Sequence, residues 1–485
     1  LRSAGYATGC FGKWHIGEHY PSHPNGQGFD EFFGMPQGHW DNYFDPTLEH
    51  NGQMATTRGF ITDVITDYAL RFMERHRNRP FFCYVPYNAP HTPHQVPDRY
   101  FDKYIDRELD TRAAAIYGMV ENIDENVGRL LEKLNELALA DQTIVVFLSD
   151  NGPEGPEGSR YNAGMRGMKG TVHEGGMRVP LFIRWPGRLQ KGKLVKPIAA
   201  HVDMLPTIAD LCGVKLLNTK PLDGRSLVPL ITGAEVEWPD RMIFARTAGW
   251  RTVLSFNEPV VRDLQTLGKT VRTQRWRAVH EGDGWNLYDM SSDPSQTRDV
   301  ASYHPDVVAR LGIAFDRWLE DVTQVPIVRP PIPVGYAQRP SVNLPATEAY
   351  FNGAIRWYNR FGFAHDWLTS WTDLNDTIWW HVDVVTAGRY KASIQYTCAS
   401  AAVGTKLRIE SSDSQVDGEI VRTYDPEPYQ RPTRHPKRRF VQTFALQSLG
   451  EIELDKGCQQ ITIRALHKTA DNICDVKCVV LRHVE

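Results

Sequence analysis

Asp150 and Asn151 follow Ser149 just after an apolar, β-branched run, residues 144–148, which predicts a fully buried strand. In open α/β sheets, ligand sites form in the loops beyond the carboxyl ends of the strands. The two side chains offer oxygen atoms of the kind that Ca²⁺ and Mg²⁺ prefer, although these ions want about six or more oxygen ligands in total. An Asx turn closed by Gly152 is the alternative interpretation of the same residues.

Cationic and imidazole side chains occur at three further places suited to an anionic ligand. Lys169 lies among glycines, which allow a ligand to approach the backbone closely. Lys13 and His15 are two residues apart on a segment expected to be extended, so their side chains should point the same way. His91 lies in a proline-stiffened loop, a suitable mount for a general acid near neutral pH. Taken alone, each has an ordinary alternative: a solvated lysine, or a histidine that packs or bonds to backbone.

Alternating strand and helix patterns must position these side chains. A short strand over residues 7–11 would deliver Lys13 and His15 to the loop at its end, and a buried strand over 81–87 would lead into the His91 loop. Apolar residues recur at helical spacing over 61–75 and 112–139. This alternation predicts an α/β fold with a mostly parallel sheet covered by helices.

Patterns farther along the chain predict the domain organisation. A helix over 201–213 is followed by short strands, including 276–279 and 285–288, and by a helix over 306–320. Six prolines lie in 325–345, and strands with alternating polarity follow, among them 377–385, 390–397, 406–410 and 460–465. We therefore predict an α/β catalytic domain (1–240), a small α+β subdomain (241–324), a proline-rich linker (325–345) and a β-sandwich accessory domain (346–485).

Composition excludes several classes of protein. The chain has 485 residues, of which 41% are hydrophobic and 23% charged, as in a globular protein. Its 55 basic and 58 acidic residues nearly balance, which argues against a nucleic-acid partner. No apolar run approaches the roughly 20 residues of a membrane span. The sequence begins Leu-Arg-Ser without an initiator Met or a signal peptide, and we expect that a preceding segment is absent from it.

With these groups assembled, the chain resembles the formylglycine-dependent sulfatases of the alkaline-phosphatase superfamily. The motifs GYATGCFGKWHIG, GFDEFFG, NAPHTPHQVP, SDNG and GMKGTVHEGGMRVPLFIRWPG occur in that family's order. HVDMLPTIADLCG and WNLYDMSSDPSQTRDVA are similar to its C-terminal subdomain. The resemblance covers residues 1–321, and an ordered set of this size outweighs the separate ordinary alternatives.

The resemblance implies roles position by position. Asp150 and Asn151 match the second pair of metal ligands, usually for Ca²⁺, with Mg²⁺ as the alternative ion. Lys13 matches the lysine that contacts formylglycine and sulfate, and His15 the histidine at the formylglycine hydroxyl. His91 matches the histidine at the leaving oxygen, and Lys169 the second sulfate-binding lysine. The implied activity is sulfuric ester hydrolysis on a sulfated carbohydrate or aryl sulfate, and the family implies a periplasmic or secreted location.

The sequence also departs from the family pattern. An N-terminal Asp pair and a Cys/Ser-x-Pro-x-Arg motif, which provides formylglycine, are expected upstream of GKWHIG, and neither is present. Cys10 lies in Cys-Phe-Gly-Lys and does not fit that motif. We therefore predict that the chain as written shows no sulfatase turnover and weak metal affinity. A phosphodiesterase or phosphonate hydrolase of the same superfamily, and a non-catalytic carbohydrate-binding protein, are the alternative functions.

The last domain carries two features that suit a sulfated glycan. Aromatic residues that can stack on sugar rings, or form the sandwich core, are Trp357, Tyr358, Trp367, Trp371, Trp379 and Trp380. On an alternating strand one of Trp379 and Trp380 must face inward. A basic run that can bind a polyanion, or remain a solvated loop, comprises Arg431, Arg434, Lys437, Arg438 and Arg439. Carbohydrate binding is therefore the candidate role of this domain, whereas the oligomeric state is left open.

Overall fold

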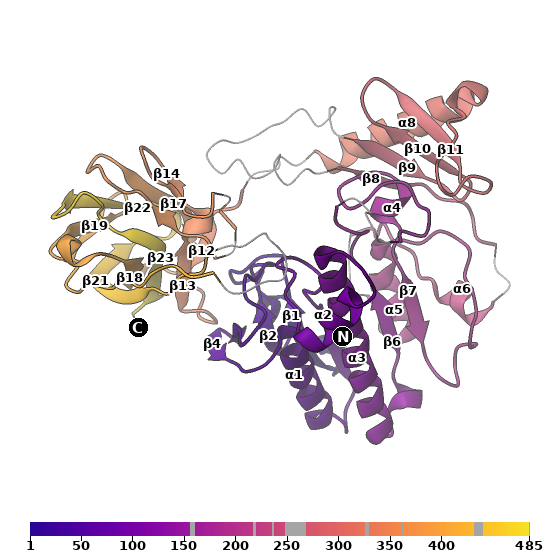
Figure 1. Cartoon of the computed structure of the whole chain (residues 1–485), viewed down its shortest axis with the longest axis horizontal. Coiled ribbons are helices and arrows are strands. Elements are labelled where there is room, and N and C mark those ends of the chain that lie inside the picture. Colours follow the sequence, from indigo (N-terminus) through magenta and orange to yellow (C-terminus); the bar gives the residue numbers. More distant parts are fainter. Residues whose placement is uncertain are drawn as a thin grey trace. The chain divides into compact units, whose positions relative to one another are not determined.

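The computed structural model describes residues 1–155, 161–216, 220–234, 237–247, 268–324, 329–360, 362–363, 365–430 and 440–484. The chain divides into two compact units. Unit 1 comprises Leu131–Val328 together with Leu1, and unit 2 comprises Arg2–Leu130 together with Arg329–Glu485. Figure 1 shows the elements of both, and each unit is treated by itself below.

A five-stranded mixed sheet in unit 2 carries the first group of candidate residues. Its order is β4 (Gln53–Thr56), β3 (Thr47–His50), β2 (Glu31–Met35), β1 (Ala7–Lys13) and β5 (Phe81–Tyr84). The interior strand β1 pairs in parallel with β2 and β5, whereas β2, β3 and β4 pair antiparallel. The strand predicted over 81–87 is half-buried rather than buried, because within the sheet β5 has β1 as its one neighbour.

Helix α1 (Ile61–Arg75) covers this sheet with the apolar face that its periodicity predicts. Phe72 of α1 packs on Phe11 of β1, with ring centroids 5.2 Å apart, and both rings are fully buried. Helix α2 (Asp98–Ile105) follows the His91 loop, and α3 (Thr111–Glu136) begins in unit 2 and ends in unit 1. Alanines 113–115 and Met119 of α3 are buried, in agreement with the predicted helix.

Unit 1 holds a two-stranded and a four-stranded sheet. The first pairs β6 (Val145–Leu148) antiparallel with β7 (Leu181–Arg184). The expectation of a fully buried strand before Asp150 is wrong: Phe147 and Leu148 of β6 are 39% and 38% exposed. The physical reason is that, among the described residues, β6 has β7 as its one strand neighbour. The helices of this part of unit 1 are α4 (Glu174–Met177), α5 (Met204–Leu211) and α6 (Val228–Thr232).

The predicted α+β subdomain is built on an antiparallel sheet. Its strands are, in spatial order, β11 (Trp285–Asp289), β10 (Trp276–His280), β9 (Lys269–Arg272) and β8 (Ile243–Arg246). Helix α8 (Pro305–Val322) packs on this sheet through Leu311, Phe315 and Leu319, all of which are buried. The periodicity of 306–320 therefore identified a real core face.

The C-terminal part of unit 2 has two six-stranded sheets around one apolar core, which confirms the predicted β-sandwich class. The first sheet contains β12 (Ile332–Val334), β14 (Tyr350–Phe351), β17 (Thr377–Val384), β22 (Gly457–His467), β19 (Lys406–Glu410) and β20 (Gln415–Glu419). The second contains β13 (Ser341–Pro345), β15 (Arg356–Trp357), β16 (Leu368–Thr369), β23 (Asp475–His483), β18 (Gly388–Thr397) and β21 (Ala445–Leu454). We call this part the sandwich.

Part of the predicted proline-rich linker belongs to the sandwich. Residues 332–334 pair as β12 with β17, and residues 341–345 pair as β13 with β23. Prolines are tolerated there since β12 lies at a sheet edge and Pro345 ends its strand. Residues 325–328 and the basic run over 431–439 lie outside the described residues.

The aromatic residues of the sandwich divide between core and surface as alternation requires. Trp380 is fully buried, whereas Trp379 is half-buried and stacks on Tyr350 at a centroid distance of 5.9 Å. Trp367 and Trp371 are also buried. These three buried tryptophans therefore form core rather than a sugar-stacking surface, and Trp379 remains available on the outer surface.

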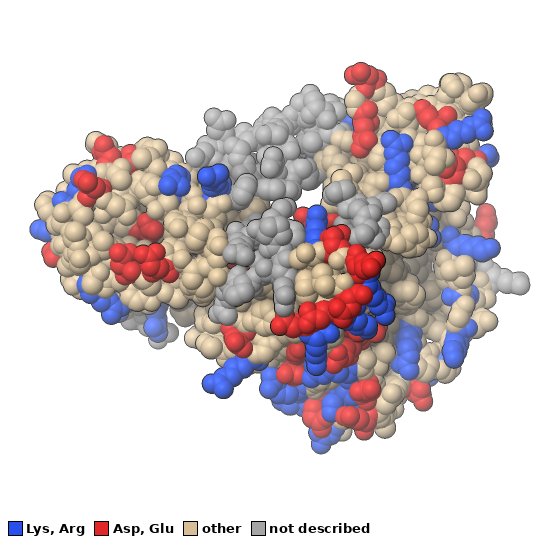
Figure 2. Space-filling view, viewed as in Figure 1, with Lys and Arg blue, Asp and Glu red and all other residues tan. Residues whose placement is uncertain are grey.

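Charges of both signs are mixed on the described surface. Figure 2 shows Lys and Arg side chains interspersed with Asp and Glu over α2 and α3, where Lys103 pairs with Glu121 at 2.5 Å. This mixing agrees with the net charge of -3. No described helix combines the length and apolarity that a bilayer crossing requires.

Candidate active site

The end of β1 places Lys13 through close backbone contacts. The Lys13 amide donates to the carbonyl oxygen of Pro86 at 2.8 Å. Gly12 allows this approach, because a Cβ at that position would lie 2.2 Å from the same carbonyl oxygen. Lys13 also pairs in register with Met35 of β2. The lysine predicted to bind sulfate therefore lies at the carboxyl end of an interior strand of its sheet.

His15 departs from the expected extended conformation. Its φ is 64°, in the left-handed region that residues other than glycine seldom adopt. The argument that Lys13 and His15 point the same way on an extended segment therefore does not apply. The ring of His15 instead packs on the backbone of Gly38, and Gly38 has a φ of 78°.

His91 is held in one orientation by its neighbours. Its Nδ1 lies 3.0 Å from the carbonyl oxygen of Thr92, which can only accept, so Nδ1 carries the hydrogen. The hydroxyl of Tyr43 donates to the carbonyl oxygens of His91 and Thr92 at 3.0 and 3.1 Å. With Nδ1 committed, Nε2 is the nitrogen that would exchange a proton with a leaving oxygen.

Sequence reasoning missed His39 and Asp41, which lie beside His91. The ring centroids of His39 and His91 are 5.3 Å apart, and His39 Nε2 lies 2.8 Å from Asp41 Oδ1. Asp41 is buried and so orients the imidazole of His39. The string GHWDN contains the His-x-Asp pair, but nothing in its spacing shows that it reaches a loop some fifty residues away.

In unit 1 the loop of Lys169 is bonded to the segment that follows Asp150 and Asn151. The Lys169 amide donates to the carbonyl oxygen of Pro153 at 2.9 Å. Gly152 donates to the carbonyl oxygen of Gly176 at 3.0 Å. Asp150 and Lys169 are both exposed, and the side-chain Nδ2 of Asn151 donates to the carbonyl oxygen of Gly152 at 2.9 Å. The predicted metal and sulfate ligands of this unit therefore belong to one hydrogen-bonded group of loops.

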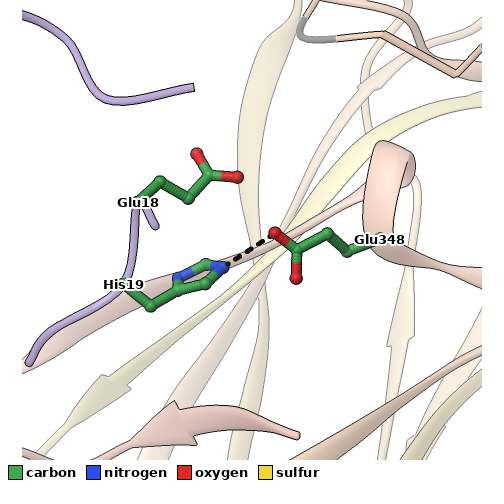
Figure 3. Close-up of side chains that lie close together, drawn as sticks. All are labelled: Glu18, His19 and Glu348. Atoms are coloured by element: carbon green, nitrogen blue, oxygen red, sulfur yellow. Dashed lines mark hydrogen bonds and ion pairs between the residues drawn. The ribbon is translucent and has the colours of Figure 1, made fainter. Parts of the chain in front are cut away.

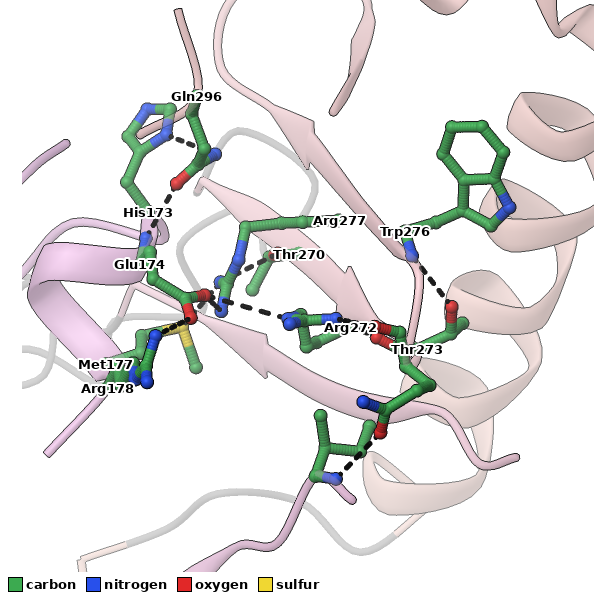
Figure 4. A network of polar contacts seen from close by, with 12 residues as sticks. His173, Glu174, Met177, Arg178, Thr270, Arg272, Thr273, Trp276, Arg277 and Gln296 are labelled. Atoms are coloured by element: carbon green, nitrogen blue, oxygen red, sulfur yellow. Dashed lines mark hydrogen bonds and ion pairs between the residues drawn. The ribbon is translucent and has the colours of Figure 1, made fainter. Parts of the chain in front are cut away.

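A buried ionic network holds the turn that follows Lys169 against the four-stranded sheet (Figure 4). Glu174 accepts from Arg277 Nη2 at 2.6 Å, and Arg272 Nε lies 3.6 Å from the same carboxylate oxygen. Burial lowers the pKa of both guanidinium groups, although Glu174 opposes this. Arg277 also donates to the carbonyl oxygen of Val172 at 2.9 Å.

His173 extends this network. Its Nε2 lies 3.1 Å from Glu281 and its Nδ1 3.1 Å from Gln296, whose Oε1 accepts from the Glu174 amide at 2.8 Å. Burial lowers the pKa of His173. The α+β subdomain thus fixes the turn next to Lys169, a role that sequence reasoning did not assign to Glu174 or Arg277.

A second cluster joins the segment after His15 to the sandwich within unit 2. Figure 3 shows Glu18, His19 and Glu348 converging, and His19 Nε2 lies 3.3 Å from Glu348 Oε1. Burial raises the pKa of Glu18 to about 7, although His19 opposes this. The pKa of His19 is also raised, because Glu348 and Glu18 outweigh its burial, and Arg329 lies 3.7 Å from Glu348.

The residues present fit the family's metal and nucleophile only in part. Asp150 and Asn151 are oxygen donors suited to Ca²⁺, but two side chains fall short of the roughly six ligands that such an ion needs. Cys10 is fully buried, and burial raises the pKa of its thiol, so it does not serve as a nucleophile. The chain thus contains the candidate residues for sulfate binding and proton transfer, but two candidate metal ligands where about six are needed.

Comparison with known proteins defines the family. The sulfatase family model matches residues 1–214, and a model described as N-sulphoglucosamine sulphohydrolase, C-terminal, matches residues 168–312. The solved structure of Ps i-CgsB is 30% identical, with a TM-score of 0.60, over 67% of this chain and 74% of that chain. The chain belongs to the sulfatase family. Resemblance in the motifs and likeness in the fold therefore agree for this sulfatase-family chain.

Curated relatives give the same family over part of their length. The uncharacterized sulfatase YdeN of Escherichia coli is 29% identical over 64% of this chain and 64% of its own. The human N-acetylgalactosamine-6-sulfatase is 32% identical over 50% of this chain and 49% of its own. The sulfatase-family chain thus spans between about half and two thirds of the length of these relatives.

Proposed function

We propose that the protein hydrolyses sulfate esters, with a sulfated carbohydrate as the substrate class and an aryl sulfate as the simple surrogate. The observation that carries the proposal is family membership, and the resemblance of Lys13, His91 and Lys169 to the family's sulfate-contacting residues supports it. The substrate class is supported by the Ps i-CgsB structure, which was solved with k-i-k-neocarrahexaose. By the same resemblance, we propose Ca²⁺ as the ion and a periplasmic or secreted location.

The proposed roles follow from charge and orientation. A sulfate ester is an anion, and its transition state places further charge on the bridging oxygen. Lys13 and Lys169 would neutralise the sulfate oxygens. His91 in its imidazolium form, with its Nδ1–H donated to the carbonyl oxygen of Thr92, would give the Nε2 proton to the leaving oxygen and become neutral. His15 would stabilise the attacking group. When present, formylglycine supplies the nucleophile and the metal ion withdraws charge from the sulfate.

The test is release of inorganic sulfate by the protein expressed from its own gene. A panel of sulfated oligosaccharides and 4-nitrophenyl sulfate would be assayed beside a phosphodiester and a phosphonate ester. We expect sulfate release that Lys13→Ala lowers by at least about a hundredfold, as for the loss of one preorganised charge donor. His91→Ala should lower the rate of hydrolysis more for substrates with poor leaving groups than for 4-nitrophenyl sulfate, whose leaving group needs little protonation.

Two controls define the outcome. Lys103→Ala removes a lysine of α2 that pairs with Glu121 on the surface, so sulfate release should be unchanged. Preferential hydrolysis of the phosphodiester or phosphonate ester would overturn the proposal in favour of the superfamily alternative. Glycan binding with no hydrolysis of any ester by the gene's own product would favour the carbohydrate-binding alternative.

A further inference from the structure

Two residues of the sandwich lie beside the histidines of the candidate active site. The ring of Phe363 is 6.4 Å from that of His39, and the ring of His365 is 4.0 Å from that of Trp40. His39 in turn contacts the ring of His91 at 5.3 Å. These side chains are all partly exposed, so each retains surface for contact with a ligand. We call the four residues other than His91 the ring cluster: His39, Trp40, Phe363 and His365.

Hydrogen bonds within the sandwich fix the segment that carries Phe363 and His365. The carboxylate of Asp366 accepts from the backbone amides of Asn359, Gly362 and Trp367 at 2.9, 3.1 and 3.0 Å. Lys477 donates to the carbonyl oxygen of Asp366 at 3.1 Å. Asp366 is 2% exposed, so these bonds are protected from water. A position this closely determined suits a residue that must meet a ligand in one geometry.

His39, in the other half of the ring cluster, is oriented by Asp41, whose Oδ1 lies 2.8 Å from His39 Nε2. The partly buried position of Lys477 in the sandwich lowers its pKa, and the carboxylates of Asp366, Glu18 and Asp41 are among the groups that oppose this. The charge of this sandwich lysine is therefore influenced by a carboxylate from each half of the surroundings of the ring cluster.

Resting on the proposed function, we propose that the ring cluster binds the sugar ring attached to the ester oxygen next to His91. Aromatic faces of Trp40 and Phe363 suit the apolar faces of a pyranose. His39 donates its Nε2–H to Asp41, so its Nδ1 can accept a hydrogen bond from a sugar hydroxyl. The ligand is a sulfated oligosaccharide, and the sandwich forms part of the catalytic site's substrate contact rather than an independent glycan module.

Binding by the chain 1–485 tests this without requiring turnover. Calorimetric titration would compare a sulfated carrageenan hexasaccharide, its desulfated form and inorganic sulfate. We expect the sulfated hexasaccharide to bind and Phe363→Ala to weaken it about three- to tenfold, the effect of losing one aromatic contact. Phe363→Leu, which keeps the apolar volume, should fold like wild type and still weaken binding. Inorganic sulfate affinity should be unchanged in both variants.

Tyr303→Ala is the matched control, since Tyr303 of unit 1 is a 70% exposed aromatic residue with no assigned role in binding. Hexasaccharide binding that falls in Tyr303→Ala and not in Phe363→Leu would overturn the proposal. Equal binding of the desulfated glycan, or no hexasaccharide binding by wild type, would overturn it as well. Lys13→Ala separates the two proposals. If Lys13→Ala weakens hexasaccharide binding while Phe363→Leu does not, the proposed function stands and the ring-cluster proposal is wrong. If Phe363→Leu weakens hexasaccharide binding but the gene's own product hydrolyses no sulfate ester, the ring cluster binds the glycan and the proposed function is wrong.

Discussion

The imidazole of His15 lies so close to the backbone of Gly38 that a Cβ at Gly38 would come within 2.0 Å of its Cγ. Both residues have positive φ, at 64° and 78°. The loop after β1 and the loop after β2 are thus shaped around each other, and the histidine depends on a missing side chain for its position.

Gly38→Ala should therefore displace His15 and destabilise the protein by about 3 kcal/mol, the sum of left-handed strain and overpacking. Chemical denaturation measures the change. Gly28→Ala is the control, because Gly28 also has a positive φ of 98° but a Cβ added there would meet nothing within 4 Å. It should cost only about 1 to 2 kcal/mol. Equal decreases in the free energy of unfolding of the two variants would show that the contact with His15 does not contribute to stability.

Glu18 and His19 should make unit 2 less stable as the pH rises. Folding raises the pKa of Glu18 from 4.5 to about 7 and that of His19 above 6.5, so each stabilises the fold in its protonated form. This contribution is complete below the unfolded values and is lost as the pH rises through about 7. We expect thermal melts to show a loss on the order of 1 kcal/mol between about pH 6 and pH 8.

Glu18→Gln should flatten that pH dependence, because glutamine stays neutral. Glu74→Gln, which alters a surface carboxylate paired with Arg77 at 3.3 Å, should keep it. A wild-type profile that rises instead of falling across this interval would contradict the assignment.

Arg277→Ala should destabilise unit 1 by about 3 to 5 kcal/mol, because it leaves the carboxylate of Glu174 buried without its closest cation. Hydrogen exchange should then increase in residues 166–178, the segment around Lys169. Arg275→Ala is the control, because it removes a nearby arginine that is 58% exposed and pairs with Asp289 at 2.8 Å. It should lower the free energy of unfolding by less than about 1 kcal/mol.

The chain 1–485 should bind Ca²⁺ only weakly, with a dissociation constant in the millimolar range, because Asp150 and Asn151 provide two of roughly six required ligands. It should also release no 4-nitrophenol from 4-nitrophenyl sulfate. Calorimetry and a colorimetric assay check the two statements. Submicromolar Ca²⁺ affinity that survives Asp150→Ala would place the ion elsewhere, and measurable turnover would refute the claim that the nucleophile is absent from this chain.

The sequence by itself determined the family, the α/β class and the helices with long apolar periodicity, whereas the roles of Lys13, His91 and Lys169 stay predictions. Local pattern was sufficient there, since helix faces and strand alternation depend on residues close together in the chain. Local pattern did not predict the burial of β6, because burial depends on what covers the strand. It also did not predict that residues 332–334 form a strand, because their pairing with β17 overrides a proline-rich composition. How the residues of unit 1 meet those of unit 2 stays a prediction.

Tertiary structure alone decided which distant residues accompany the predicted ones. His39 beside His91, Arg277 beneath the Lys169 turn and Phe363 beside His39 are separated by about fifty to more than three hundred positions, and no periodicity links them. Such pairs form because buried charges need partners and rings pack against other side chains, and the partner can come from any part of the chain. Only the folded backbone determines which partners those are.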